Sequence, residues 1–145
     1  MVRELERNTP YRPKMSILGS KDFYCIQSLN QDGKKFATKT ELCDELLEKD
    51  GCSFYQNSRQ LSKLAHGIMD IEDLVKLGKK EGGCPYYASK ALADAADIVF
   101  MPYNYLIDPL IRETCDIKLD GNIVILDEAH NIEGMLLILY YRLLL

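Results

Sequence analysis

Two short segments, residues 97–101 and 122–126, constrain the fold of this chain most strongly, because each has one polar residue followed by a continuous apolar run. A strand that is apolar on both faces is typical of a parallel sheet covered by helices. Residues 102–114, between the two runs, are predicted to be helical, which gives the order strand, helix, strand of an α/β fold. A further short strand is predicted at residues 15–18, after Pro13. The two ends of the chain therefore predict an α/β fold with a parallel sheet.

The middle of the chain predicts helices instead. Thr40 could cap a helix that runs to about Lys49, and Asp70 could cap a second helix over residues 71–80. A third helix is predicted to begin at Pro85 and to continue to Ala96, because proline suits the first turn of a helix. The intervening residues, including Cys52, are expected to form a loop. The middle is therefore predicted to be a small helical unit that carries cysteines.

The composition of the chain argues against several classes of function. The net charge is −4, from 18 basic and 22 acidic residues, so no general cationic field indicates a nucleic-acid partner, and such a site would have to be local. No apolar segment approaches the roughly 20 residues that a membrane span needs, and the first residues do not resemble a signal peptide. Five cysteines without an export signal indicate a reducing compartment, and their odd number argues against a closed disulfide set.

The strongest chemical pattern lies at residues 124–130, where an apolar run ends in Asp127, Glu128, Ala129 and His130. In an open parallel sheet, ligands bind beyond the carboxyl ends of the strands. There Asp127 could hold Mg²⁺, usually through water, and Glu128 could take a proton from an attacking water molecule. The alternative is that the two carboxylates only cap the helix that follows.

A phosphate-binding loop is missing from this sequence. Such a loop needs a glycine five positions before a Gly-Lys pair that is followed by Ser or Thr. The pairs Gly33-Lys34 and Gly78-Lys79 are each followed by another lysine, and neither has the upstream glycine. These residues supply half of a nucleotide site, and we expect that alone they do not hydrolyse ATP.

Four cysteines are dispersed over the middle of the chain, at Cys25, Cys43, Cys52 and Cys84. Structural zinc sites usually pair their ligands in closely spaced knuckles, and no such pair is present. Widely spaced thiolates in a reducing compartment are compatible with an iron–sulfur cluster, which takes four of them. Spacing alone leaves three interpretations open: a cluster, a zinc site, or ordinary packed cysteines.

Several motifs in order resemble the iron–sulfur DEAH helicases of the xeroderma pigmentosum group D and Fanconi anaemia group J type, with the strongest resemblance to the regulator of telomere elongation helicase. The matching stretches lie at residues 18–21, 70–76, 84–87, 96–106 and 127–133. The resemblance implies part of a RecA-like P-loop NTPase motor domain with an inserted, mostly helical iron–sulfur domain. It assigns motor segments to residues 1–20 and 91–134, the inserted domain to residues 21–90, and leaves an atypical apolar tail at residues 135–145.

The resemblance also implies site residues and cofactors. It assigns a [4Fe–4S] cluster to Cys25, Cys43, Cys52 and Cys84 and leaves Cys115 as a packing residue. In the complete enzyme, which would use ATP and Mg²⁺, Asp127 and Glu128 would be catalytic and His130 would couple the nucleotide site to other motor elements. The implied function is a fragment of a nuclear, ATP-dependent 5′→3′ DNA helicase in DNA repair and telomere maintenance, inactive alone.

The implied partners are single-stranded or forked DNA and the rest of the helicase chain, namely the phosphate-loop segment, the arch domain and the second motor domain. Lys21 and Lys90 occupy positions where relatives commonly carry arginine, and both could neutralise a backbone phosphate. Tyr86, Tyr87, Tyr103 and Tyr105 could stack on bases, but packing between the cluster domain and the motor is the favoured interpretation.

Two departures from the family pattern stand out. Gln27-Ser28 stands where the family usually has a His-Pro pair, which weakens the family argument for the geometry around Cys25 but leaves Cys25 as a ligand. The tail at residues 135–145 is uniformly apolar, which indicates a truncated or misread gene; a splice variant or a buried helix are alternatives. Two rival hypotheses follow: a non-catalytic iron–sulfur DNA-binding or regulatory fragment, and a non-functional product of a damaged gene.

Overall fold

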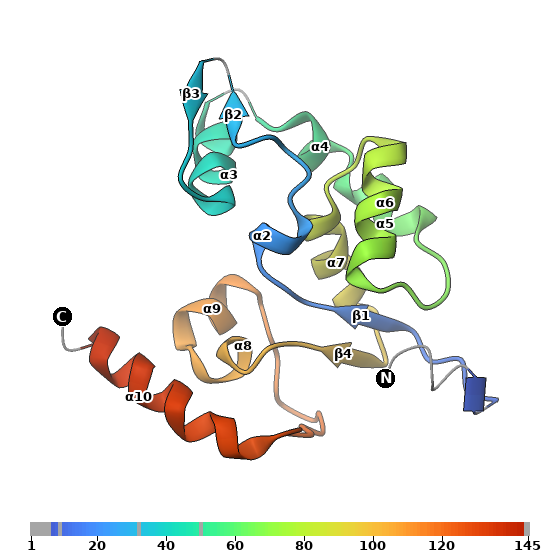
Figure 1. Cartoon of the computed structure of the whole chain (residues 1–145). Coiled ribbons are helices and arrows are strands. Elements are labelled where there is room, and N and C mark those ends of the chain that lie inside the picture. Colours follow the sequence, from blue (N-terminus) through green and yellow to red (C-terminus); the bar gives the residue numbers. More distant parts are fainter. Residues whose placement is uncertain (1–6, 9, 32, 50, 144–145) are drawn as a thin grey trace. The chain divides into compact units, whose positions relative to one another are not determined.

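A computed structural model describes residues 7–143 apart from 9, 32 and 50, without the side chains of residues 138–143. The chain divides into a first unit, Met1–Phe100, and a second unit, Met101–Leu145. Each unit is described by itself (Figure 1).

A small parallel sheet closes the first unit. Strand β1 (Met15–Ile17) pairs in parallel with β4 (Ile98–Phe100), so that Met15 lies opposite Ile98. The Lys14 backbone N–H donates to the Asp97 carboxylate at 2.8 Å and fixes this register. The predicted strands at both positions and the predicted parallel α/β class are confirmed. Because β1 and β4 are adjacent, the residues between them form an insertion that leaves the sheet and returns to it.

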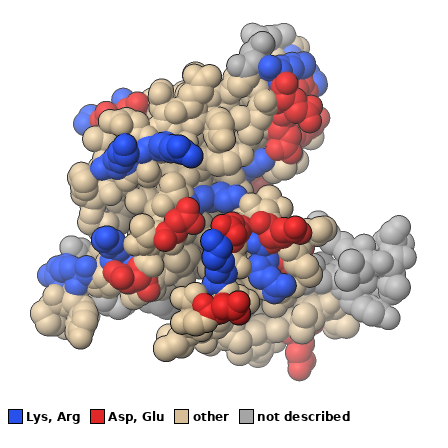
Figure 2. Space-filling view, turned by 180° about the vertical axis from the view of Figure 1, so that it is seen from behind, with Lys and Arg blue, Asp and Glu red and all other residues tan. Residues whose placement is uncertain are grey.

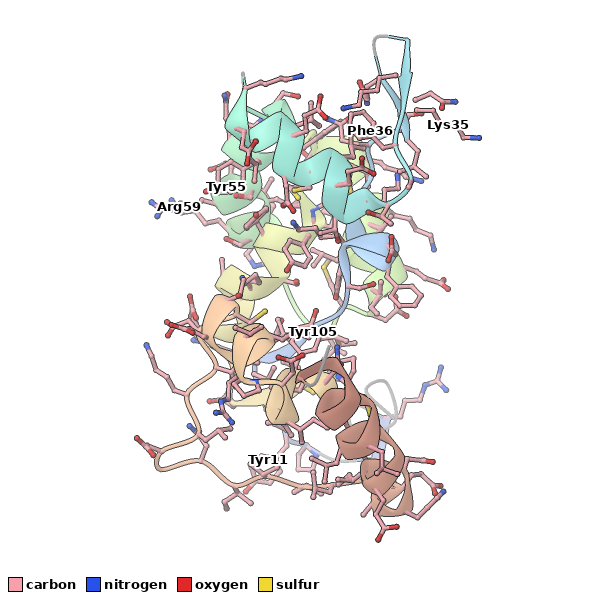
Figure 3. All side chains as sticks on the ribbon, turned by 90° about the vertical axis from the view of Figure 1, so that its left-hand side faces the viewer. Tyr11, Lys35, Phe36, Tyr55, Arg59 and Tyr105 are labelled. Atoms are coloured by element: carbon pink, nitrogen blue, oxygen red, sulfur yellow. The ribbon has the colours of Figure 1, made fainter. Side chains whose placement is uncertain are left out.

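The insertion is mostly helical, as predicted (Figure 1). In chain order it contains α2 (Lys21–Tyr24), the hairpin strands β2 (Asn30–Gln31) and β3 (Lys34–Lys35), α3 (Lys39–Glu48), α4 (Ser53–Gln56), α5 (Ser58–Leu64), α6 (Ile71–Glu81) and α7 (Pro85–Ala93). At the hairpin, Phe36 is buried while the Lys35 side chain points away from the ribbon (Figure 3).

Two local expectations for the insertion were wrong. The loop expected around Cys52 contains α4 and α5, whose apolar positions are too few to show a helical period. Helix α3 is capped by Thr38 and not by Thr40, because the Thr38 hydroxyl accepts from the Glu41 backbone N–H at 3.1 Å.

Helix α6 has the ends that its sequence predicts. Asp70 and Asp73 form a reciprocal capping box at its start. Gly82 ends it in the left-handed region at φ 68°, which glycine adopts at little cost. Within the helix, Gly78 lies so close to the next helix that an added Cβ would be 2.5 Å from the Pro85 Cγ. This glycine therefore lets α6 and α7 pack closely.

The core of the first unit joins the helices to the sheet. Its fully buried members are Tyr24, Leu61, Leu74 and Ala88, which come from α2, α5, α6 and α7. The Tyr24 hydroxyl donates to the Ile17 carbonyl at 2.6 Å, so the core residue also anchors β1. Burial of these four side chains is the main source of cohesion between the four helices.

The second unit contains α8 (Asn104–Ile107), α9 (Pro109–Thr114), the 3₁₀ turn η1 (Ala129–Asn131) and α10 (Ile132–Leu143). The helix expected over residues 102–114 is interrupted at Asp108. Asp108 precedes Pro109, and a proline disfavours the helical conformation of the residue before it. The Asp108 carboxylate also caps α9, because it accepts a hydrogen bond from the Leu110 backbone N–H at 3.0 Å. None of the described helices is long and apolar enough to cross a membrane.

The strand predicted at residues 122–126 is not present, and this expectation is corrected. The segment is irregular and pairs with no strand among the described residues. Ile123 and Ile125 are 91% and 88% exposed. A strand requires a neighbour that takes up its backbone hydrogen bonds, and the described part of this unit offers none. The apolar tail begins in α10, where Leu136 and Leu137 are exposed.

Candidate metal centre

Four cysteines from four elements line one small cavity in the first unit. Cys25 follows α2, Cys43 lies within α3, and Cys52 and Cys84 immediately precede α4 and α7. The rest of the lining is largely apolar and aromatic, with Ile26, Gln27, Leu46, Phe54, Tyr55 and Tyr87. The tertiary structure thus brings together thiols that are 18, 9 and 32 residues apart in the sequence.

Backbone hydrogen bonds hold these cysteines in place. The Cys84 N–H donates to the Phe54 carbonyl at 2.7 Å, which joins the start of α7 to α4 just beyond Cys52. The Cys25 N–H donates to the Lys21 carbonyl at 2.8 Å and ends α2. Cys52 and Cys84 are buried, and the other two are half-buried. Every described cysteine is a free thiol.

Burial makes these thiols reluctant to ionise. It raises the pKa of Cys84 to about 11, although the backbone N–H groups of Tyr87 and Tyr86 partly oppose this shift. Burial also raises the pKa of Cys43, against the nearby Lys21 charge. The neighbouring thiols Cys25 and Cys52 raise both pKa values further, because clustered thiolates repel one another. A bound cation would remove that repulsion, since the thiolate is the form that ligates metals.

Two lysines and three tyrosines lie beside the cavity. The rings of Tyr55 and Tyr87 meet edge to face at 4.6 Å between centroids, and those of Tyr86 and Tyr87 at 5.1 Å. The Lys21 and Lys90 ammonium groups lie 5.8 and 5.7 Å from the Tyr86 ring centroid. Figure 3 labels Tyr55, which lies on α4, and Arg59, which lies on the next helix, α5. Tyr86 and Tyr87 therefore pack beside the thiol cavity, within the first unit.

The contacts of Lys21 differ from those that the sequence suggested. Its ammonium forms an ion pair with the Asp44 carboxylate at 2.7 Å, and its side chain is only 13% exposed. Much of its charge is therefore directed towards Asp44 and the thiols. Sequence reasoning, which placed Lys21 on a DNA-facing surface, did not find this partner because Asp44 lies 23 residues away.

A polar side chain that sequence reasoning missed also lines the cavity. The Gln27 side-chain amide donates to the Cys52 sulfur at 3.4 Å. The Gln27-Ser28 departure was interpreted only as weakening the family argument for the geometry around Cys25. No sequence pattern indicates a contact across 25 residues, so only the structure reveals it.

The acidic motif lies in the second unit and is open. Asp127, Glu128 and His130 are all exposed, and Glu128 adopts the left-handed conformation at φ 52° just before η1. The His130 Nδ1 lies 3.3 Å from the Glu128 carboxylate. The two carboxylates are adjacent in the sequence, whereas Lys21 and Lys90 belong to the first unit. Cys115 also belongs to this unit, at the end of α9.

Charged side chains are mixed on the molecular surface. Figure 2 shows lysine and arginine interspersed with aspartate and glutamate over the face that it presents. This distribution agrees with the net charge of −4.

Among the residues described, no group of three or more His, Cys, Asp or Glu side chains is arranged to hold a single metal ion.

Comparisons with known proteins extend this description. The DEAD_2 family profile matches residues 1–139. The chain is 46% identical over 138 residues to regulator of telomere elongation helicase 1 of Homo sapiens, covering 93% of this chain and 11% of that protein. It is 48% identical over 144 residues to the Fanconi anemia group J protein homolog of Gallus gallus, covering 92% of this chain and 11% of that protein.

A solved structure of a truncated XPD is similar in fold, with a TM-score of 0.55 and 24% identity. That similarity covers 89% of this chain and 35% of the solved chain. The chain therefore spans about a tenth of the length of the curated helicases that it matches.

Proposed function

This chain belongs to the DEAD_2 family, and from that premise we propose that it is the cluster-bearing part of the first motor domain of an iron–sulfur DNA helicase. The observation that carries the proposal is the convergence of Cys25, Cys43, Cys52 and Cys84 on one cavity. The whole helicase would be ATP-dependent, would move 5′→3′ on single-stranded DNA, and would act in the nucleus in repair or telomere maintenance.

The donor set fits a [4Fe–4S] cluster, which takes four cysteine thiolates. An apolar lining is suited to such a group because it limits access of water. Binding would supply a covalent link between α2, α3, α4 and α7, and Lys21 would offset part of the thiolate charge. Two of these elements, α2 and α7, also carry the core residues Tyr24 and Ala88, so cluster binding and folding are expected to be coupled.

The nucleotide chemistry is assigned to the second unit. Asp127 would hold Mg²⁺ and Glu128 would activate water, while His130 would link the site to other motor elements. ATP hydrolysis would require the phosphate-binding loop, the arch domain and the second motor domain from elsewhere in the helicase chain. Lys21 and Lys90 would contact single-stranded or forked DNA.

The experiment is anaerobic reconstitution of the full chain with iron and sulfide. We expect about four iron atoms per chain and loss of most of this iron in each serine variant of Cys25, Cys43, Cys52 and Cys84. Cys115→Ser is the matched control, because Cys115 lies in the other unit, and it should keep its iron. A wild-type chain without iron and sulfide, or iron loss in the control alone, would contradict the proposal.

A second candidate function is a non-catalytic iron–sulfur DNA-binding or regulatory fragment. It is favoured by the contrast between the two units: the thiol site is assembled within the first unit, whereas the acidic motif has no phosphate-binding loop in this sequence. Titration of reconstituted chain with forked DNA, run beside an ATPase assay, separates this fragment from an active enzyme. Binding without hydrolysis is expected of the fragment, and hydrolysis would indicate an active enzyme.

A further inference from the structure

The contact between Gln27 and Cys52 is specific in direction. The Gln27 Nε2 lies 3.4 Å from the Cys52 Sγ, and sulfur is an acceptor for an amide N–H at this distance. Both residues line the cavity that the four thiols share. Gln27 therefore supplies a side-chain hydrogen bond to a sulfur of the proposed cluster site.

A second glutamine fixes which end of the Gln27 amide faces the sulfur. The Gln31 Nε2 donates to the Gln27 Oε1 at 3.1 Å and also to the Ser28 carbonyl at 3.3 Å. Because the oxygen of the Gln27 amide is occupied as an acceptor, its NH₂ group is turned towards Cys52. The Lys39 ammonium donates to the Gln27 backbone carbonyl, which holds the residue from the start of α3. The donor is thus oriented by three neighbours.

A hydrogen bond to a ligand sulfur acts differently on the two redox states of a cluster. The reduced state carries one more negative charge, and an N–H donor stabilises it more than the oxidised state. Hydrogen bonds to the sulfurs are among the factors that set the potentials of iron–sulfur clusters. The surroundings of Cys52 are buried, so the effect is weakly screened by water.

We propose that Gln27, oriented by Gln31, is a positioning residue that raises the reduction potential of the cluster through its hydrogen bond to the Cys52 sulfur. The proposal rests on the proposed function, because it requires a cluster on these thiols. It goes beyond that function, since it assigns to this chain's own Gln27-Ser28 segment a role in setting the potential.

The test is a redox titration of the full, anaerobically reconstituted chain, with dithionite as the electron donor and visible absorption as the readout. Gln27→Leu removes the donor without adding charge. We expect it to hold as much iron as the wild type, while the equilibrium ratio of reduced to oxidised cluster falls at least tenfold at a fixed potential. For a one-electron couple this corresponds to a downward shift of about 59 mV.

Two further variants separate hydrogen bonding from packing and charge. Gln31→Leu leaves Gln27 in place but releases its orientation, so a smaller shift in the same direction is expected. Gln27→Glu adds a negative charge as well and should lower the potential further than Gln27→Leu. Gln60→Glu adds the same charge at an exposed position on α5, outside the cavity lining, and should leave the potential unchanged.

The outcomes are distinguishable. Wild-type chain without iron and sulfide would overturn the proposed function together with this inference. Iron-loaded Gln27→Leu and Gln31→Leu with the wild-type potential would overturn the inference alone. If Gln27→Leu does not retain iron, Gln31→Leu decides: a lowered potential supports the inference, and an unchanged one overturns it. Circular dichroism of each variant shows whether the helices are intact.

Discussion

The Lys21 ammonium lies 2.7 Å from the Asp44 carboxylate and joins the short helix before Cys25 to the helix that carries Cys43. Lys21 is 13% exposed and Asp44 is 57% exposed, so the pair lies at the edge of the thiol cavity. The same lysine opposes the rise in the Cys43 pKa that burial causes. One ion pair thus links two of the proposed ligand-bearing elements and places a positive charge among the thiols.

Lys21→Gln is expected to lower the free energy of unfolding of the full chain by about 1 kcal/mol, since the Asp44 partner remains hydrated. Chemical denaturation measures this loss. In a double-mutant cycle with Asp44→Asn, the coupling energy between Lys21 and Asp44 should account for most of this loss. Lys63→Gln, at an exposed lysine on α5, is the control and should change stability little. Equal losses in both variants would show that the ion pair contributes nothing.

Gly78→Ala is expected to destabilise the first unit by about 1–3 kcal/mol, the usual cost of forcing extra volume into a packed site. The added Cβ would be 2.5 Å from the Pro85 Cγ and 2.8 Å from the Gly83 carbonyl oxygen. Thermal unfolding followed by circular dichroism measures the effect. Gly134→Ala, where a Cβ meets nothing within 4 Å, is the matched control. A stabilised Gly78→Ala variant would contradict this packing of α6 against α7.

In metal-free chain, the Cys84 thiol should make stability depend on pH. Burial raises its pKa from 9.0 to about 11, so the folded state favours the protonated thiol. Its contribution is therefore complete below pH 9 and is lost as pH rises towards 11, by up to about 2 kcal/mol. Urea unfolding of wild type and Cys84→Ser across this range, under reductant, gives the difference. A difference that does not change with pH would contradict the shift.

The exposed segment at residues 122–126 should tolerate polar residues in this chain. Ile123→Lys together with Ile125→Lys is expected to change the free energy of unfolding by no more than about 0.5 kcal/mol per site, because both side chains are already hydrated. The same variants should reduce self-association, which light scattering measures. A large loss of stability would mean that these isoleucines are packed in solution. Leu74→Ala, in the core, should cost roughly 2–5 kcal/mol by comparison.

The 145-residue chain is expected to show no DNA-stimulated ATPase activity, because its sequence contains no phosphate-binding loop beside Asp127 and Glu128. Phosphate release in the presence of single-stranded DNA measures this. Glu128→Gln should behave like the wild type at the detection limit. Robust hydrolysis that is lost in Glu128→Gln would contradict this prediction and indicate a complete site.

Sequence reasoning succeeded where structure follows from neighbouring residues. The cap at Asp70, the stop at Gly82 and the start at Pro85 depend on local backbone chemistry, and the structure confirms them. The short apolar runs that became β1 and β4 also follow from local composition. The predicted family and α/β class are also confirmed. Both were predicted from motifs that can be read in order along the sequence.

Other features depend on partners far apart in the sequence. Residues 122–126 have the composition of a strand but pair with no strand among the residues that the structure describes, and hydrogen bonding between strands cannot be read from one segment. Helices α4 and α5 form because Leu61 joins the core with Leu74 and Ala88, and not because of their own pattern.

The sequence by itself determined the starts of α6 and α7, the two paired strands, the family, and the identity of the four thiols as candidates. Only the tertiary structure decided that those thiols share one cavity, that Lys21 is paired with Asp44, and that Gln27 faces Cys52. The physical reason is distance along the chain. Caps and turns are satisfied within a few residues, whereas a shared cavity exists only after helices from separate segments have packed around it.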